Sequence, residues 1–219
     1  MAPTTVNSIN FDLPHAAPGS LDVRWTHGSI SAKHNTDPDI QVHPYNEHTI
    51  ILRQNMAVHP EAPFMFLLFG NDRAILLDTG ATRSSDFFPL RQTVDTLIDQ
   101  WLTKYPHKNY QLIVAHTHLH RDHFEADPQF LDRPNTVMVD KTLEATQTFY
   151  GFQNWPQDQV MFDLGGRPLQ ILATPGHEEA EVSIYDPYTH LLFTGDLVYP
   201  GRLYIQDWAA FSDSIERMI

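Results

Sequence analysis

Residues 115–123 have the sequence Ala-His-Thr-His-Leu-His-Arg-Asp-His, which places four histidines and one aspartate within eight residues. Packing alone does not explain so many ionisable side chains in one short stretch. Neutral imidazole and carboxylate are side chains that bind zinc and similar divalent ions. The chain contains no cysteine, so a structural zinc finger built on cysteine ligands does not fit. The stretch therefore predicts a metal site of another kind.

The spacing within this stretch predicts how the ligands divide. Side chains two residues apart in extended chain point the same way, whereas adjacent side chains diverge. We therefore expect His118 and His120 to bind one ion, and Asp122 and His123 to face another. His116 has two interpretations: it supports a ligand histidine from behind, or it is an ordinary buried imidazole with its own hydrogen bonds.

Length and charge limit the classes of protein to consider. A chain of 219 residues with 42% hydrophobic residues is the size of one domain. We expect a flexible N-terminal arm over residues 1–20, which are rich in Pro, Ser, Asn and Thr, and a single domain over residues 21–219. The net charge of -13 argues against nucleic acid and anionic membrane as partners, because basic residues drive binding to polyanions.

Targeting signals are not evident in the sequence. The first ten residues lack the basic and apolar regions of a signal peptide, and no later apolar run approaches the length of a membrane span. We therefore expect a cytoplasmic protein that acts on a small molecule. The absence of cysteine supports this location only weakly.

Hydrophobic patterning predicts alternating strands and helices. Apolar runs and turn residues predict strands over residues 48–53, 64–69, 74–77, 111–115, 136–139, 159–164, 169–173, 181–185 and 190–194. Three-four apolar spacing and flanking signals predict helices over residues 88–105, 141–149 and 207–218. This order favours a mixed α/β fold in layers.

Three further short elements carry polar groups where a predicted strand ends: Asp78-Thr79-Gly80, Thr174-Pro175-Gly176-His177 and Thr194-Gly195-Asp196. Each alone could be a plain turn. Taken in order with Thr117–His123, however, they make the chain resemble the hydrolases of the metallo-β-lactamase fold, in the branch that contains lactonases and glyoxalase II. The matching elements extend from about residue 48 to residue 200.

The resemblance implies an αββα sandwich, in which two mixed sheets pack between outer helices and hold metals at one edge. It implies two metal ions, zinc by default, with iron or manganese as alternatives. In that arrangement Asp122 also handles the proton of the reaction, and Asp78 orients a ligand histidine. The resemblance implies that the first metal is held by His118, His120 and His177, the second by Asp122 and His123, and that Asp196 bridges both.

The function implied by the resemblance is hydrolysis of an ester, lactone or related acyl substrate. Two divalent ions lower the pKa of a shared water, so that hydroxide forms near neutral pH, and polarise the carbonyl under attack. Tyr199 lies three residues after Asp196, where acyl-homoserine lactonases carry a tyrosine, and its hydroxyl could donate to the oxyanion. The alternative for Tyr199 is an ordinary packing residue.

The chain departs from the family pattern in two places. A further histidine ligand usually follows the helix after Asp196, but the sequence ends at Ile219. The fold is therefore expected to lack its C-terminal end, with an incomplete second metal site and an exposed strand edge that favours self-association. Residues 124–126 are Phe-Glu-Ala, where glyoxalase-II-like relatives have a small residue followed by Gly-Gly, and this bulk makes a thioesterase of that kind less expected.

Three other functions remain open. A mononuclear iron oxygenase acting on a persulfide shares the fold, and would leave Asp122 and His123 outside the metal's ligands. A β-lactam hydrolase generally carries Cys or Ser in place of Asp196. A non-catalytic module could keep the fold and one metal. We also expect the acidic residues 178–181 to form a solvated loop without a catalytic role.

Overall fold

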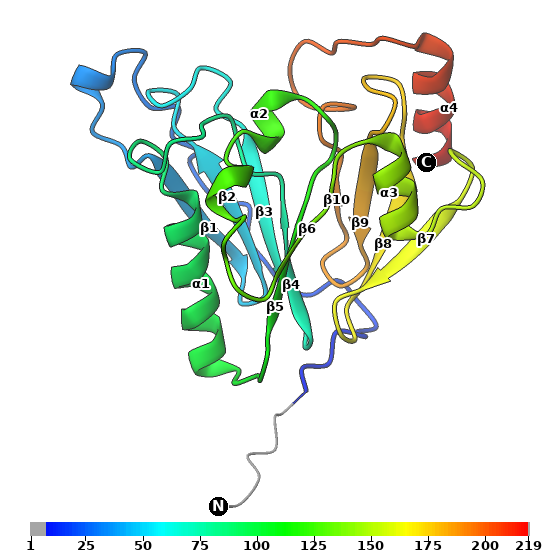
Figure 1. The fold of residues 1–219 in the computed structure, drawn as a ribbon, viewed down its shortest axis with the longest axis horizontal. Helices are drawn as coiled ribbons and strands as arrows, with labels where there is room; N and C mark the ends of the chain where they lie inside the picture. The colour runs from blue at the N-terminus through cyan, green and yellow to red at the C-terminus, as the bar shows by residue number, and fades with distance from the viewer. Residues whose placement is uncertain (1–7, 219) are drawn as a thin grey trace, which may run out of the picture.

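The computed structural model describes residues 8–218, which form two facing β-sheets with helices outside both (Figure 1). The first sheet has six strands in chain order, and its last three strands run parallel. The second sheet has four antiparallel strands in the order β10-β9-β8-β7. The first sheet contains β1 (Ile40–Asn46), β2 (Thr49–Gln54), β3 (Phe64–Phe69), β4 (Arg73–Leu77), β5 (Gln111–Ala115) and β6 (Thr136–Met138). The second contains β7 (Gln159–Asp163), β8 (Pro168–Ala173), β9 (Val182–Asp186) and β10 (Leu191–Phe193).

Helices cover the outer side of each sheet. Helix α1 (Leu90–Lys104) lies against the first sheet, whereas α3 (Leu143–Tyr150) and α4 (Trp208–Met218) lie on the side of the second (Figure 1). The short helix α2 (Arg121–Phe124) lies at the upper rim. This is the expected αββα arrangement. Within residues 8–218, no helix is both long and apolar enough to span a bilayer.

Two apolar layers hold the sandwich together. Alternate residues of one strand point to opposite faces of a sheet, so β3 contributes Leu67 to the layer under α1 and Leu68 to the layer between the sheets. Helix α1 buries Val94, Ile98 and Trp101 on its apolar face, as its three-four spacing predicts. The layer between the sheets also includes side chains of β4, β5, β8 and β9.

The predicted elements are present with boundaries shifted by a few residues, but strand β1 is missing from the predicted set. In its sequence Ile-Gln-Val-His-Pro-Tyr-Asn only Ile40 is buried, and the other side chains are half-buried or exposed, so only a weak apolar pattern marks it. Pro44 lies within it and accompanies a register shift against β2. Proline is tolerated there because β1 is an edge strand.

The N-terminal arm makes specific contacts over its described part, residues 8–20. Phe11 is buried against the rings of His48 and Tyr188. The backbone N–H of Ile9 donates to Asn71 Oδ1 at 2.7 Å, and that of Ala17 donates to the Tyr188 carbonyl at 2.7 Å. Flexibility of the arm stays a prediction, as does self-association through the second sheet, in which β10 is an edge strand.

One buried arginine joins the two sheets at the lower end of the sandwich. The Arg167 side chain is 0% exposed and pairs with Asp186 in the second sheet, with Nη2 2.6 Å from Oδ2. The same guanidinium donates to the His48 carbonyl at 2.6 Å, the Phe69 carbonyl at 2.9 Å and Thr49 Oγ1 at 2.7 Å, all from the first sheet. Its planar group of donors satisfies acceptors from both sheets at once.

We predict that Arg167→Met lowers the free energy of unfolding by about 3–5 kcal/mol, because it leaves Asp186 buried and unpaired. Urea unfolding measures this loss. The matched control is Arg91→Met, since Arg91 pairs with Asp132, whose side chain is 85% exposed, and such pairs contribute about 1 kcal/mol or less. Equal losses in the two variants would contradict the role given to Arg167.

His48, next to this arginine, is buried in an uncharged form. Its Nδ1 accepts a hydrogen bond of 3.1 Å from Trp101 Nε1. Burial, reinforced by the positive charge of Arg167, lowers the pKa of His48 to about 4. Between that value and the unfolded value of about 6.5, the unfolded chain binds a proton that the folded chain does not. The free energy of unfolding therefore falls as pH decreases from 6.5 toward 4.

We predict that this histidine contributes a loss of about 3 kcal/mol across that pH range. The measurement is urea unfolding at several pH values for the wild type and for His48→Gln, whose amide does not titrate. Subtracting the two curves removes the pH dependence of all other groups. Parallel curves would contradict a depressed pKa at His48.

Candidate metal centre

The predicted metal ligands lie on segments at the upper end of the sandwich, where Figure 1 shows helix α2. Arg167 precedes β8 and His177 follows it, so the arginine lies at the opposite end. The ligand segments follow strands of both sheets. The segment after β5 and helix α2 carry His118, His120, Asp122 and His123, whereas the segments after β8 and β10 carry His177 and Asp196. A site built this way exists only when both sheets hold their relative positions.

The first ligand group contains the three histidines expected for the first metal. Atoms of His118, His120 and His177 lie within 4.8 Å of one another. His120 Nδ1 is 3.0 Å from His118 Nε2 and 2.9 Å from His177 Nε2. The three rings are nearly perpendicular to one another, with interplanar angles of 85–88°.

In His177 and His118, Nε2 is the inner nitrogen, which faces the other histidines, and Nδ1 is the outer nitrogen, which points away from them. The contacts of the outer nitrogens indicate that the inner nitrogens suit a cation. His177 Nδ1 lies 2.6 Å from the Tyr204 carbonyl, which can only accept, so Nδ1 carries the proton and Nε2 presents a lone pair. His118 Nδ1 lies 3.1 Å from Thr117 Oγ1, which allows the same arrangement. Burial, followed by neighbouring imidazoles, lowers the pKa of His118. Neutral imidazoles with converging lone pairs fit a divalent metal.

The second group contains His118, His123 and Asp196, again within 4.8 Å. His123 Nε2 lies 3.4 Å from Asp196 Oδ1 and 3.5 Å from Asp122 Oδ2. The other Asp196 oxygen, Oδ2, lies 3.7 Å from His177 Nε2 in the first group. Asp196 thus faces both groups, as expected of a bridging ligand, while its role on a bound metal remains a proposal.

Opposing effects set the charge state of the second group. Burial alone would lower the pKa of His123, but Asp78 and Asp196 outweigh it and raise that pKa well above its usual value. Burial would likewise raise the pKa of Asp196, but its hydrogen bond with His123 holds the pKa below its usual value. A divalent ion would replace a proton as the positive charge that satisfies these carboxylates.

Asp78 contacts the ligand segment from behind, and its role in orienting a ligand histidine on a bound metal stays a prediction. Its Oδ1 accepts from the Thr117 N–H at 2.8 Å, and its Oδ2 lies 2.9 Å from His123 Nδ1 and 3.0 Å from Thr117 Oγ1. The contact with Nδ1 leaves His123 Nε2 toward the metal group. The backbone of Asp78 has φ of 65°, a conformation that Asp and Asn adopt more readily than most residues.

His116 belongs to a different network from the ligands. Its Nε2 lies 2.8 Å from Asp127 Oδ1, and the other Asp127 oxygen accepts from Lys141 Nζ at 2.8 Å. Thr79 Oγ1 also donates to Asp127, at 2.9 Å. His116 therefore has a carboxylate partner outside the ligand groups, whereas its Nδ1 has no hydrogen-bond partner among residues 8–218. Its support of a ligand histidine stays a prediction. Asp127 was not singled out in the sequence because it lies outside the four motif elements.

Tyr199 has a different partner from the one proposed for catalysis. Its hydroxyl donates to the carbonyl of Arg202, so in this conformation the hydroxyl proton is not directed at a substrate. Donation to an oxyanion would need another rotamer or a moved loop, and this role stays a prediction.

The expected solvated loop at residues 178–181 is wrong for Glu181, which is 0% exposed. Burial, followed by the charge of Asp196, raises the pKa of Glu181 to about 9. The prediction treated the acidic run as one solvated loop. Glu179 is exposed as expected, whereas Glu181 turns inward just before β9. Its inward direction follows from contacts distant in the chain, which local sequence does not reveal.

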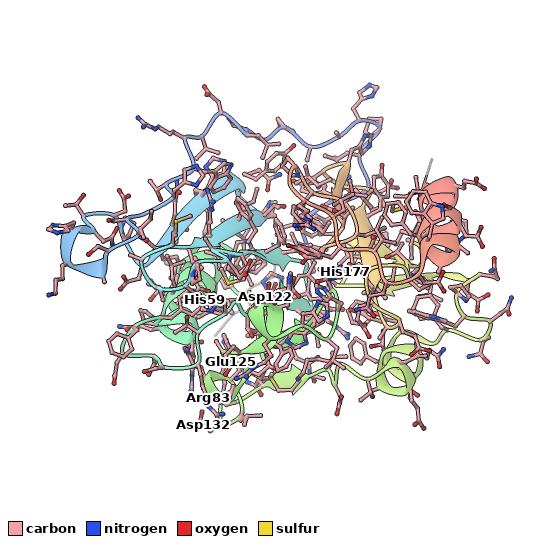
Figure 2. All side chains as sticks on the ribbon, turned by 90° about the horizontal axis from the view of Figure 1, so that it is seen from above. His59, Arg83, Asp122, Glu125, Asp132 and His177 are labelled. Carbon is pink, nitrogen blue, oxygen red and sulfur yellow. The ribbon has the colours of Figure 1, made fainter. Side chains whose placement is uncertain are left out.

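A pocket of about 540 Å³ opens beside the second ligand group. The loop between β2 and β3 contributes His59 to it, the segment after β4 contributes Arg83, and α2 with the following residue contributes Asp122 and Glu125. Figure 2 labels these four side chains as seen from above the rim. Asp122 lies outside both ligand groups, 3.5 Å from His123 Nε2, and is the predicted ligand that lines this pocket.

We predict that Asp78→Asn weakens zinc binding at the second site about 10–100-fold, as loss of a carboxylate behind a ligand histidine does, and leaves the first site within a few-fold of wild type. Asn tolerates the backbone conformation, but its amide group disturbs the contact with His123. Zinc titration against a competing chelator measures both sites. Asp99→Asn, on the exposed side of α1, is the control; weakening of both sites alike would contradict the specific role.

Comparison with curated proteins gives partial matches to hydrolases of acyl compounds. The chain is 28% identical over 147 residues to hydroxyacylglutathione hydrolase of Rhizobium meliloti, a match covering 64% of this chain and 54% of that protein. It is 32% identical over 91 residues to the protein of the same name from Bartonella tribocorum, covering 40% and 36%. It is 38% identical over 56 residues to human acyl-coenzyme A thioesterase MBLAC2, covering 26% and 19%. The matches thus span about half or less of these relatives' length.

Solved structures share the fold at low sequence identity. A metallo-beta-lactamase from Pontibacter korlensis aligns with a TM-score of 0.56 at 18% identity, covering 82% of this chain and 84% of that one. A metallo-beta-lactamase from Hirschia baltica gives a TM-score of 0.56 at 17% identity, with coverage of 83% and 86%. The family model described as the metallo-beta-lactamase superfamily matches residues 60–217. With that match over most of its length, the chain belongs to the metallo-β-lactamase superfamily.

Proposed function

We propose that this chain is a metal-dependent hydrolase that uses two divalent ions, with zinc as the first ion to test and acyl compounds as its substrates. One observation carries the proposal: the two ligand groups share His118, and Asp196 faces both. The superfamily supports hydrolysis, whereas the number of ions, their identity and the substrate belong to the proposal.

The chain's own residues divide the work of hydrolysis among them. Bound divalent ions would supply a water of lowered pKa and polarise the substrate carbonyl. His118, His120 and His177 would hold one ion, and Asp122 and His123 the other, with Asp196 between them. Asp122 also lines the pocket, so its carboxylate is the group placed to accept a proton from water and return it to the leaving group.

Thioesters are the first substrate class to test. The names of the similar curated proteins denote acyl groups carried on glutathione and coenzyme A. The Phe-Glu-Ala sequence at 124–126 argued against such a substrate, but the Phe124 ring packs under Lys141, 4.5 Å from its Nζ, and Ala126 is buried. Of these three residues, only Glu125 lines the pocket. Residues 124–126 therefore place only one side chain, the charged Glu125, in the pocket, which weakens the argument from their bulk against a thioester. Lactones are the second substrate class to test.

We predict that the wild type binds about two zinc ions and loses thioester hydrolysis when a chelator removes them. His120→Ala should lose metal and activity together. Asp122→Asn should keep the first ion while kcat falls about 10²-fold or more, since positioned acid–base groups contribute about 10²–10⁴-fold. Metal content by mass spectrometry and initial rates on acyl-glutathione, acyl-coenzyme A, lactone and β-lactam substrates measure these effects.

The control is His34→Ala, because His34 is exposed in a 3₁₀ turn of residues 32–34 far from the ligand segments in sequence. Near-normal activity in either site variant would mean that the ligands are misassigned. One tightly bound iron together with oxygen uptake on a persulfide would replace the hydrolase proposal by the oxygenase alternative. Metal binding without turnover of any of these substrates would favour the non-catalytic module.

A further inference from the structure

Glu181 is a buried carboxylate that the proposed reaction does not use. Its side chain is 0% exposed, and the only basic side chain within 4.0 Å of it among residues 8–218 is His118, with 3.9 Å between Glu181 Oε1 and His118 Nδ1. Burying a carboxyl group is costly unless its polar atoms are hydrogen-bonded. Glu181 Oε1 has such a partner, whereas Oε2 has none among the described residues.

The first thing that Glu181 holds is the turn carrying Asp196. The backbone N–H of Asp196 donates to Glu181 Oε1 at 3.1 Å. The turn passes between Glu181 and Thr117 at Gly195, where a Cβ atom would lie 3.2 Å from Glu181 Oε1 and 2.7 Å from Thr117 Cβ. Gly195 has φ of 52°, so both the conformation and the close approach require glycine. The Glu181 side chain therefore fixes the position of Asp196 relative to the segment that carries His118 and His120.

The second contact is with the back of a ligand histidine. The same oxygen, Oε1, faces His118 Nδ1, on the side of the ring opposite the Nε2 that meets His120. Thr117 Oγ1 lies closer to this Nδ1, at 3.1 Å. The distance of 3.9 Å is too long for a hydrogen bond, so Glu181 acts on His118 by packing behind its ring and beside Thr117.

These two contacts join opposite halves of the fold. His118 follows β5 of the first sheet, and Asp196 follows β10 of the second. Glu181 itself precedes β9, and its backbone carbonyl accepts from the Thr174 N–H at 2.8 Å, three residues before His177. The Glu181 side chain thus contacts the ligand segments that follow β5 and β10. Its backbone is hydrogen-bonded beside a third ligand segment, the one that carries His177.

We infer that Glu181 is a positioning residue of the metal centre, which sets the separation between His118 and Asp196 and so the fit of both ions. It is not itself a ligand, because its oxygens lie behind His118 and it belongs to neither ligand group. The inference rests on the metal centre of the proposed function and requires no change in the proposed reaction.

The test compares Glu181→Leu, which fills similar space without an acceptor, with Glu181→Gln, whose carbonyl oxygen can still accept from Asp196. Zinc affinity is measured by chelator competition, and the absorption spectrum of the cobalt-substituted protein reports ligand geometry. We expect Glu181→Leu to weaken zinc binding about 10–100-fold and to alter the cobalt spectrum, and Glu181→Gln to restore most of the affinity. Glu179→Gln, in the same acidic run but exposed, should match wild type.

Melting of the metal-free proteins separates positioning from general stability. A folded Glu181→Leu protein with wild-type zinc affinity and cobalt spectrum would overturn the inference, even if its melting temperature fell. Should Glu181→Leu fail to fold, Glu181→Asp takes its place, because it keeps the carboxyl group but withdraws the oxygens by one methylene. Unchanged zinc affinity in Glu181→Asp would equally overturn the inference. A wild type that binds no metal defeats the proposed function as well, whereas tight binding in all variants defeats only the role of Glu181.

Discussion

The buried guanidinium of Arg167 is the constraint on which the metal centre depends, although it lies at the opposite end of the sandwich. It pairs with Asp186 of the second sheet and donates to two backbone carbonyls of the first. Apolar packing between sheets is non-directional, so it fixes the distance between the sheets better than the lateral position of one sheet over the other. Directional hydrogen bonds to both sheets add the missing constraint. Because His118 and Asp196 come from different sheets, their ligand atoms meet only if the sheets keep the relative position to which Arg167 contributes.

At the end of the sandwich that carries the metal ligands, hydrogen-bond acceptors behind the histidines orient their rings. Asp78 accepts from Thr117 and contacts His123 Nδ1, and the Tyr204 carbonyl accepts from His177 Nδ1. Each such contact places the proton on the outer nitrogen and leaves the inner nitrogen free. His120 Nδ1 lies 3.0 Å from His118 Nε2 and 2.9 Å from His177 Nε2, so these three nitrogens are close enough to bind one divalent ion together. The acceptors behind the rings therefore prepare the site for an ion before any substrate arrives.

The sequence predicted the parts of the fold that depend on local patterns and on motif order. Strands β3 and β5 are continuous apolar runs, and α1 has regular three-four spacing, so each has a strong local signal. Strand β1 has only one buried side chain and an internal proline, and its pairing with β2 decides its conformation. Glu181 illustrates the same limit within the site. Its charge predicted exposure, but the acceptor needed by the Asp196 turn, 15 residues away, determines where it lies.

The same ligands can serve different substrates because the walls of the site come from other segments. The solved β-lactamase structures share the sandwich at 17–18% identity, which supports the fold and says nothing of the pocket. Here the walls come from the β2–β3 loop and the segment after β4, which supply His59 and Arg83. Neither segment contributes a metal ligand, so either can change without loss of the ions. Arg121 in the pocket is neutralised by Glu125, with 3.0 Å between Nε and Oε2, whereas Arg83 has no such ion pair among residues 8–218. We therefore expect Arg83, rather than Arg121, to be the side chain of this wall that meets a negatively charged group on a substrate.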